Sequence, residues 1–174
     1  MLVIFEGTDL CGKTTIAKKL VEEFSAPMPV TFKYFDFFKN KKLGDWMRYI
    51  DVIAEVEYNA IKQVQYLNFV LDRFFVSSLI YNKVYERKYD VSYINPLDFK
   101  QAITIFVDTP LEVLIERSKQ RADDQKIIDR LEILSSEYKE YFSTYKYDLT
   151  VIDGSVDVND NVEMLTKIIL KYFR

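Results

Sequence analysis

The sequence predicts an α/β protein with a three-layer α/β/α fold and a parallel sheet of about five strands. Short apolar segments alternate with longer segments of helical periodicity along the whole chain of 174 residues. Strands separated by helices pair in parallel through right-handed crossovers, so helices cover both faces of the sheet. A chain of this length can bury one core, and we expect residues 1–174 to form a single domain.

The strands are predicted from apolar runs that end at polar or turn residues. The first, Leu2 to Phe5, is apolar throughout, as a buried strand would be. The second, Val30 to Phe35, is β-branched and aromatic. Three further strands are expected at 66–73, 102–108 and 149–155, the last of which includes a turn.

The helices are predicted from apolar residues at helical spacing between these strands. Ile16 to Phe24 carries the first such stripe, and the segment 45–65 lacks Gly and Pro. Pro110 suits the first turn of a helix over 111–120. The remaining helices are expected at 77–89, 127–145 and 162–172, with connectors at 26–29, 36–42 and 90–96.

Residues 7–14 read G-x-x-x-x-G-K-T, the phosphate loop of P-loop NTPase folds. The pattern lies between a predicted strand and a predicted helix, where backbone N–H groups can face a polyphosphate. Lys13 can reach the β- and γ-phosphates, and the Thr14 hydroxyl can bind Mg²⁺. The alternative is a chance glycine turn. The residues expected to hold the phosphates of ATP are Gly7, Thr8, Leu10, Cys11, Gly12, Lys13, Thr14 and Thr15.

An acid and a base, Asp72 and Arg73, end the third predicted strand, which this topology places beside the phosphate loop. Asp72 is the expected Mg²⁺ ligand together with Thr14, either directly or through water. Arg73 has the fork geometry for bidentate contact with a second phosphate. The alternatives are a surface acid for Asp72 and an ion pair with a neighbouring acid for Arg73.

Two arginines, Arg117 and Arg121, lie four residues apart, so one helical face can present both to a transferred phosphoryl group. With Lys13 and Arg73 they are the expected catalytic residues, because phosphoryl transfer needs alignment and positive charge. We expect residues 117–129 to form a short mobile lid. The alternative for both arginines is an exposed helix surface that they share with glutamates.

Composition narrows the class of function. The net charge of −3 predicts no general polyanion-binding surface, and hence no nucleic acid partner. The absence of histidine excludes a histidine base and histidine metal sites. The single cysteine, Cys11, excludes an internal disulfide and suits a reducing, cytoplasmic location. Neither a leader nor a bilayer-spanning apolar run is recognisable, so no membrane partner is expected.

The chain resembles the thymidylate kinase family in motifs that follow one another in the family's order. Residues 5–15 resemble its phosphate loop, and residues 72–77 resemble its Asp-Arg-aromatic-x-x-Ser motif. Residues 107–113 with Arg117 resemble the entry to its lid. Further matches are Tyr81-Asn82, the acid-Arg-x-Glu run at 129–132, and the last strand at 151–155.

The resemblance implies a site for a deoxynucleoside monophosphate. Asp9 would contact the 3′-hydroxyl of its sugar, Arg73 its 5′-phosphate, and Tyr81 the 2′ side of its sugar. The full set of expected acceptor-binding residues is Asp9, Lys39, Arg48, Arg73, Ser77 and Tyr81. The adenine of ATP would lie near Ser155 and Val156, and a homodimer is expected.

The resemblance also implies a catalytic arginine in the lid, because Leu10 stands where other members have an arginine in the phosphate loop. That arginine would be Arg117, Arg121 or Arg130. The segment between Gly44 and Asp72 is shorter than in typical members and lacks the Phe and Arg that read thymine. The candidate base-reading residues are instead Arg48, Tyr49, Tyr58 and Asn59.

The expected function is ATP-dependent, Mg²⁺-assisted phosphorylation of a deoxynucleoside monophosphate, with dTMP as the first candidate. One alternative is a deoxynucleoside kinase, which would need a carboxylate base such as Asp36 at the second strand. The other is a nucleotide-binding subunit without catalytic activity, against which the intact Lys13, Thr14, Asp72 and Arg73 argue.

Overall fold

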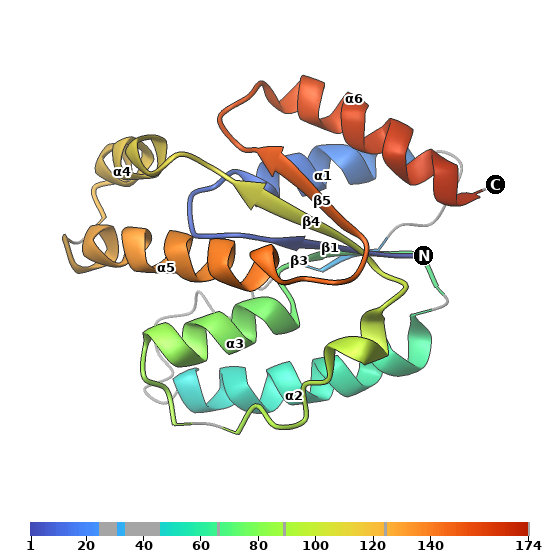
Figure 1. The fold of residues 1–174 in the computed structure, drawn as a ribbon, viewed down its shortest axis with the longest axis horizontal. Coiled ribbons are helices and arrows are strands. Elements are labelled where there is room, and N and C mark those ends of the chain that lie inside the picture. The colour runs from blue at the N-terminus through green and yellow to red at the C-terminus, as the bar shows by residue number, and fades with distance from the viewer. Residues whose placement is uncertain (25–30, 34–45, 66, 89, 124, 174) are drawn as a thin grey trace.

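The computed structural model describes residues 1–24, 31–33, 46–65, 67–88, 90–123 and 125–173. Five strands form one parallel sheet in the order β2-β3-β1-β4-β5 (Figure 1). They are β1 (Leu2–Glu6), β2 (Thr31–Lys33), β3 (Phe69–Asp72), β4 (Ile103–Asp108) and β5 (Leu149–Asp153). The predicted α/β class with a parallel sheet of about five strands is confirmed.

Six α-helices connect and follow these strands in the described part of the chain. They are α1 (Lys13–Phe24), α2 (Trp46–Val64), α3 (Phe75–Val84), α4 (Leu111–Gln120), α5 (Gln125–Ser143) and α6 (Val158–Ile169). Short 3-10 helices cover Pro96–Phe99 and Leu170–Phe173. None of the helices among the described residues is long and apolar enough to cross a membrane.

Helices α3 and α6 both begin before the residue at which the prediction starts them. Helix α3 begins at Phe75 rather than Ser77, because the distant carboxylate of Glu6 accepts the backbone N–H groups of Phe74 and Ser77. Helix α6 begins at Val158, ahead of its first predicted apolar residue, because the Asp157 side chain caps it. In both cases the start depends on satisfied N–H groups rather than on the apolar stripe.

The sheet separates two cores, and consecutive residues of β1 alternate between them. Val3 and Phe5 pack with buried residues of α1 and α6, whereas Leu2 and Ile4 pack with those of α2, α3 and α5. Figure 1 shows the same division, with α1 and α6 on one side of the sheet and α2, α3 and α5 on the other. The uniformly apolar first strand is thus explained by burial on both faces.

The topology brings the polar ends of the strands together. All pairings are parallel, so the carboxyl ends of the strands lie at one edge of the sheet. Strand β1 is central, and the loop that follows it stands where the strand order reverses, the usual ligand position in open α/β sheets. Phe5 pairs with Asp72, which places the end of β3 beside that loop.

Candidate active site

The phosphate loop joins β1 to α1 and closes around the side chain of Lys13. The buried Lys13 Nζ donates a hydrogen bond to the Thr8 carbonyl oxygen at 2.7 Å. Gly7 has φ of 147° and Gly12 has φ of 94°, conformations that favour glycine. A Cβ at Gly7 would also lie 2.7 Å from the Val107 carbonyl oxygen. The loop therefore requires glycine at both positions.

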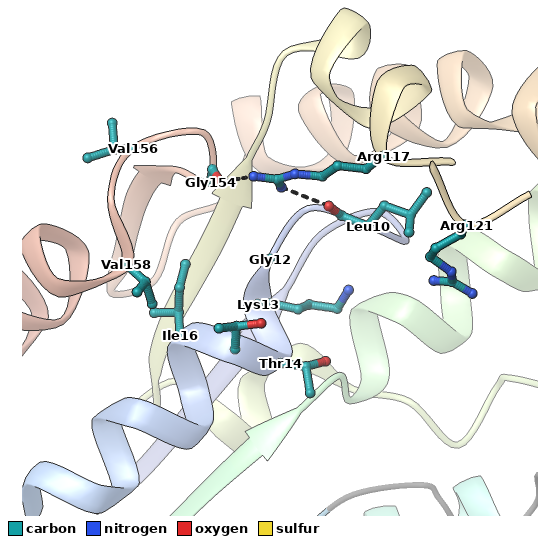
Figure 2. Close-up of a pocket in the computed structure, with 11 residues that line it drawn as sticks. Leu10, Gly12, Lys13, Thr14, Ile16, Arg117, Arg121, Gly154, Val156 and Val158 are labelled. Atoms are coloured by element: carbon teal, nitrogen blue, oxygen red, sulfur yellow. Dashed lines mark hydrogen bonds between the residues drawn. The ribbon is translucent and has the colours of Figure 1, made fainter. Parts of the chain in front are cut away.

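A cavity of about 490 Å³ lies over this loop and the first turn of α1 (Figure 2). Three cationic side chains and no acidic one line it, so it suits an anionic ligand. The lining residues are Leu10, Gly12, Lys13, Thr14, Thr15, Ile16, Arg117, Arg121, Gly154, Val156 and Val158. Gly7, Thr8 and Cys11, also expected at the phosphates, belong to the loop below, and Thr8 and Cys11 are buried.

The apolar side of the cavity lies at the connection between β5 and α6. Val156 and Val158 line it there, beside Ile16 of α1. Ser155, expected with Val156 near the adenine, is not among the lining residues. Its N–H and hydroxyl both donate to Asp153 Oδ1, each at 2.7 Å. The structure therefore brings one of the two residues expected on the adenine side to the cavity.

Arg117 ties the phosphate loop to the β5–α6 connection. Its Nη1 donates to the Leu10 carbonyl oxygen and its Nη2 to the Gly154 carbonyl oxygen, both at 2.9 Å (Figure 2). The two segments are so close that a Cβ at Gly154 would lie 2.0 Å from the Cys11 carbonyl oxygen. Arg117 thus lines the cavity while it braces two backbones.

The other arginines expected in the lid lie further from the loop. Arg121 lines the cavity, but its side chain is exposed and pairs with Asp123 at 3.5 Å. Arg130 of α5 packs its guanidinium over the ring of Tyr85, 4.4 Å from the ring centroid. The segment 117–129 comprises the end of α4, a short connection and the start of α5. Its mobility and the choice of catalytic arginine stay predictions.

Thr14 and Asp72 meet at the end of the cavity expected to hold a metal. The Thr14 hydroxyl donates to Asp72 Oδ2. Asp72 Oδ1 is buried and has no hydrogen-bond partner among the described residues. A hydroxyl and a carboxylate supply the hard oxygen atoms that Mg²⁺ prefers. An orphaned carboxylate oxygen beside the phosphate loop therefore fits this ion.

Asp9, Arg73 and Tyr81 form a cluster next to the loop. Arg73 Nη2 donates to Asp9 Oδ1 at 2.6 Å, and the Tyr81 hydroxyl donates to Asp9 Oδ2 at 2.8 Å. Burial alone would raise the pKa of Asp9, but the charges of Arg73 and Lys13 hold that pKa below its usual value. The ion pair considered as the alternative for Arg73 is therefore present, in a cluster that stays partly exposed.

Two residues at Arg73 were not singled out from the sequence. Arg73 Nη1 donates to the Tyr138 hydroxyl at 3.0 Å and to Ser77 Oγ at 3.1 Å, and Ser77 in turn donates to Glu6. Glu6 and Tyr138 are fully buried. Burial raises the pKa of Glu6, against the opposing effects of Ser77 and Arg73. A glutamate that ends an apolar strand was the available signal for Glu6.

The structure does not describe several of the residues expected at the acceptor. Lys39 is outside the described residues, as are the side chains of Arg48 and Tyr49 in α2. Tyr58 is wrong as a base-reading candidate, because it is 2% exposed and its hydroxyl bonds to Asn95 and Asp98. It anchors a loop to α2 within the core.

The thymidylate kinase family model matches residues 46–165, well over half of the chain. The chain belongs to the thymidylate kinase family. Membership makes it a nucleoside monophosphate kinase, an enzyme that phosphorylates nucleotides. A probable thymidylate kinase from Metallosphaera sedula is 29% identical over 184 residues, covering 98% of this chain and 90% of that protein. Probable thymidylate kinase 1 from Saccharolobus solfataricus is 28% identical, and the match covers 98% of this chain and 97% of that protein.

Solved structures support the kinase fold. A deoxyadenosine kinase from M. mycoides superposes with a TM-score of 0.70 and 20% identity, covering 98% of this chain and all of that one. The YorR protein from Bacillus subtilis gives a TM-score of 0.65 at 19% identity, covering 100% of this chain and 99% of that one. At these identities the likeness concerns the fold and not the substrate.

Proposed function

We propose that the enzyme transfers the γ-phosphoryl group of Mg·ATP to the 5′-phosphate of a deoxynucleoside monophosphate, with dTMP preferred. One observation carries the proposal. The cationic cavity over the phosphate loop adjoins a second basic group, Arg73, within the Asp9–Arg73–Tyr81 cluster. Two neighbouring sites for anionic groups are what transfer between two phosphates requires.

The donor half of the proposal uses the phosphate loop. Lys13, Arg117 and Arg121 surround the cavity and would neutralise charge that develops on the transferred group. Thr14 and Asp72 would hold Mg²⁺, which when bound neutralises the β- and γ-phosphates. Among the described residues no cluster of three or more His, Cys, Asp or Glu side chains could hold a metal alone. Phosphate oxygens and water would therefore supply the remaining ligands.

The acceptor half uses Arg73 and Asp9. Arg73 Nη1 donates hydrogen bonds to protein acceptors, and Nη2 donates to Asp9. The hydrogen bonds of Arg73 to described residues come from Nη1 and Nη2, so Nε would be the N–H group that it offers to an acceptor phosphate. The partly exposed Asp9 carboxylate suits a sugar hydroxyl, and Tyr81 at its other oxygen would limit room on the sugar's 2′ side.

The preference for dTMP is supported by the similarity to probable thymidylate kinases rather than by a described base pocket. A coupled ADP-release assay over the four deoxynucleoside monophosphates, UMP and thymidine tests it. We expect turnover with dTMP to exceed that with the other acceptors. Turnover with thymidine but not with dTMP would instead indicate a deoxynucleoside kinase, and Mg·ATP binding without any turnover would indicate a nucleotide-binding subunit.

The proposal includes a lid at 117–129, since this segment carries Arg117 and Arg121 over the cavity. A single domain, a homodimer and a cytoplasmic location remain predictions. Light scattering of the purified protein checks the homodimer, limited proteolysis checks the domain and the lid, and cell fractionation checks the location.

A further inference from the structure

We propose that Glu6 is a positioning residue for Arg73 and acts through a buried relay of the Ser77 and Tyr138 hydroxyl groups. The relay joins three elements: Glu6 ends β1, Ser77 lies in the first turns of α3, and Tyr138 lies in α5. Figure 1 shows α3 and α5 on the same side of the sheet, and their residues are in contact. The inference rests on the proposed function in one respect, the binding of the acceptor phosphate by Arg73.

In its ionised form the Glu6 carboxylate is the end of the relay that can only accept hydrogen bonds. Its Oε1 accepts the Phe74 N–H at 2.9 Å and the Ser77 N–H at 3.2 Å. Its Oε2 accepts the Ser77 hydroxyl. Both oxygens of this fully buried group are therefore satisfied by fixed donors from the start of α3.

This acceptor determines the direction of every other hydrogen bond. Ser77 has one hydroxyl hydrogen, which it donates to Glu6, so its oxygen accepts from Tyr138 at 2.7 Å and from Arg73 at 3.1 Å. Tyr138 gives its only hydrogen to Ser77 and therefore turns a lone pair toward Arg73 Nη1 at 3.0 Å. The charge on Glu6 thus makes two buried hydroxyl oxygens acceptors for the guanidinium.

The relay selects the edge of Arg73 that faces the acceptor. The two hydrogens of Nη1 are shared among Ser77, Tyr138 and the Gly7 carbonyl oxygen, the last at 2.7 Å. The backbone of Arg73 has φ of 70°, which is unfavourable for a side chain with a Cβ. With Nη1 anchored and the backbone constrained, Nε and Nη2 lie on the opposite edge, where Nη2 pairs with the partly exposed Asp9.

Two substitutions interrupt the relay differently. In Glu6→Gln, the amide oxygen still accepts the two backbone N–H groups, so the amide NH₂ faces Ser77. It then donates to Ser77, and the direction of the hydrogen bonds along the relay is reversed. Hydroxyl hydrogens then point at the Arg73 guanidinium. Tyr138→Phe deletes one acceptor of Arg73 and leaves Glu6 and Ser77 intact. Tyr145→Phe is a matched control, since it removes a hydroxyl bonded to Thr104, away from Arg73.

Steady-state kinetics with dTMP and ATP varied separately tests the proposal. We expect the KM for dTMP to rise about tenfold in Glu6→Gln and about fivefold in Tyr138→Phe, as for a lost bond to a charged group. The KM for ATP should change less than twofold, and Tyr145→Phe should match the wild type. An unchanged KM for dTMP in both relay variants, or an equal rise in Tyr145→Phe, overturns the proposal. If Glu6→Gln does not fold, Tyr138→Phe decides alone.

A second measurement separates failure of this inference from failure of the proposed function. In ¹⁵N NMR of the wild type without substrate, we expect distinct Nη signals for Arg73, because its guanidinium is anchored. In both relay variants these signals should merge into an average, because the guanidinium can rotate, whereas in Tyr145→Phe they should stay distinct. Averaged signals in the wild type would contradict the relay. A wild type that phosphorylates no monophosphate would contradict the proposed function and leave the NMR test intact.

Discussion

The buried Lys13 ammonium has few protein partners for its three donors. It bonds to the Thr8 carbonyl oxygen at 2.7 Å and lies 3.7 Å from Cys11 Sγ. Because the Thr8 carbonyl belongs to the phosphate loop, the loop itself positions the Lys13 ammonium at the cavity. A phosphate oxygen over α1 would complete the set of acceptors for Lys13.

We predict that Lys13→Ala lowers kcat at least about 100-fold, because a positioned electrostatic group is lost at the transferred phosphate. The ADP-release assay measures this directly. Lys167→Ala is the control, since Lys167 is exposed and pairs with Glu163 of its own helix. A Lys13→Ala enzyme with kcat within tenfold of the wild type would argue against phosphoryl transfer at this loop.

We predict that Asp72→Asn raises the Mg²⁺ concentration needed for half-maximal rate, because the uncharged amide is a poorer ligand than the carboxylate. The titration is done at saturating ATP and dTMP. Asp148→Asn, an exposed acid ahead of β5, is the control. An identical Mg²⁺ dependence in wild type and Asp72→Asn would remove Asp72 from the metal site.

The depressed pKa of Asp9 predicts a pH dependence of stability. A carboxyl group whose folded pKa lies below its ordinary value of 3.8 stabilises the fold above that value and loses the contribution as pH falls. We expect wild type to exceed Asp9→Asn in urea stability at neutral pH, with the gap closing as pH falls below 3.8. The effect is modest, because Asp9 is half exposed. A gap that widens in acid would contradict the ion pair.

At the scale of elements, the β5–α6 connection shapes the active site by its packing against the phosphate loop. Gly154 touches the loop backbone, Arg117 bridges both segments, and the Thr109 hydroxyl donates to the Cys11 carbonyl oxygen at 3.0 Å. Three connections, after β1, β4 and β5, are thereby held as one unit. The donor cavity depends on their packing together.

We predict that Gly154→Ala lowers the free energy of unfolding by about 1–3 kcal/mol and raises the KM for ATP, because the added Cβ has no space. The backbone of Gly154 does not have a positive φ, so the expected effect is steric rather than conformational. Ser155→Ala, at the neighbouring exposed position, should change the KM for ATP little. Urea unfolding and steady-state kinetics measure both effects; wild-type values for Gly154→Ala would show that the two segments can separate freely.

At the scale of the whole molecule, the parallel sheet gathers the chemistry at one edge. Side chains from the ends of β1 and β3, from the phosphate loop and from α4 meet there because every strand runs in the same direction. A ligand at this edge contacts several elements at once. Its binding should therefore stabilise the fold as a unit, since a ligand that binds only the folded state stabilises that state by an amount that grows with ligand concentration relative to Kd.

We predict that Mg·ATP at about 100 times its Kd stabilises the folded enzyme by about 2.7 kcal/mol. A thermal melt with and without Mg·ATP should show a clear rise in Tm. ATP with EDTA should give a smaller rise, and Lys13→Ala should show almost none. No rise with Mg·ATP would indicate that the cavity does not take this ligand.

The local sequence determined the fold class and the donor loop. Apolar periodicity identified the strands and helices, and the spacing of Gly7, Gly12 and Lys13 identified the loop, because both depend on residues near one another in the chain. Strand order then placed Asp72 and Arg73 beside that loop, as the pairing of Phe5 with Asp72 confirms. Roles that rest on the family resemblance, such as that of Tyr81 at the sugar, stay predictions.

Only the tertiary structure showed what holds the acceptor-side arginine. Glu6 and Tyr138 are far apart in sequence, and no local pattern links them, yet each contacts Ser77 in the core. The same buried carboxylate sets the start of α3, and Arg117 reaches backbone oxygens on two distant connections. Such contacts follow from how the layers pack, and hydrogen bonds between distant segments leave no periodic pattern in the chain.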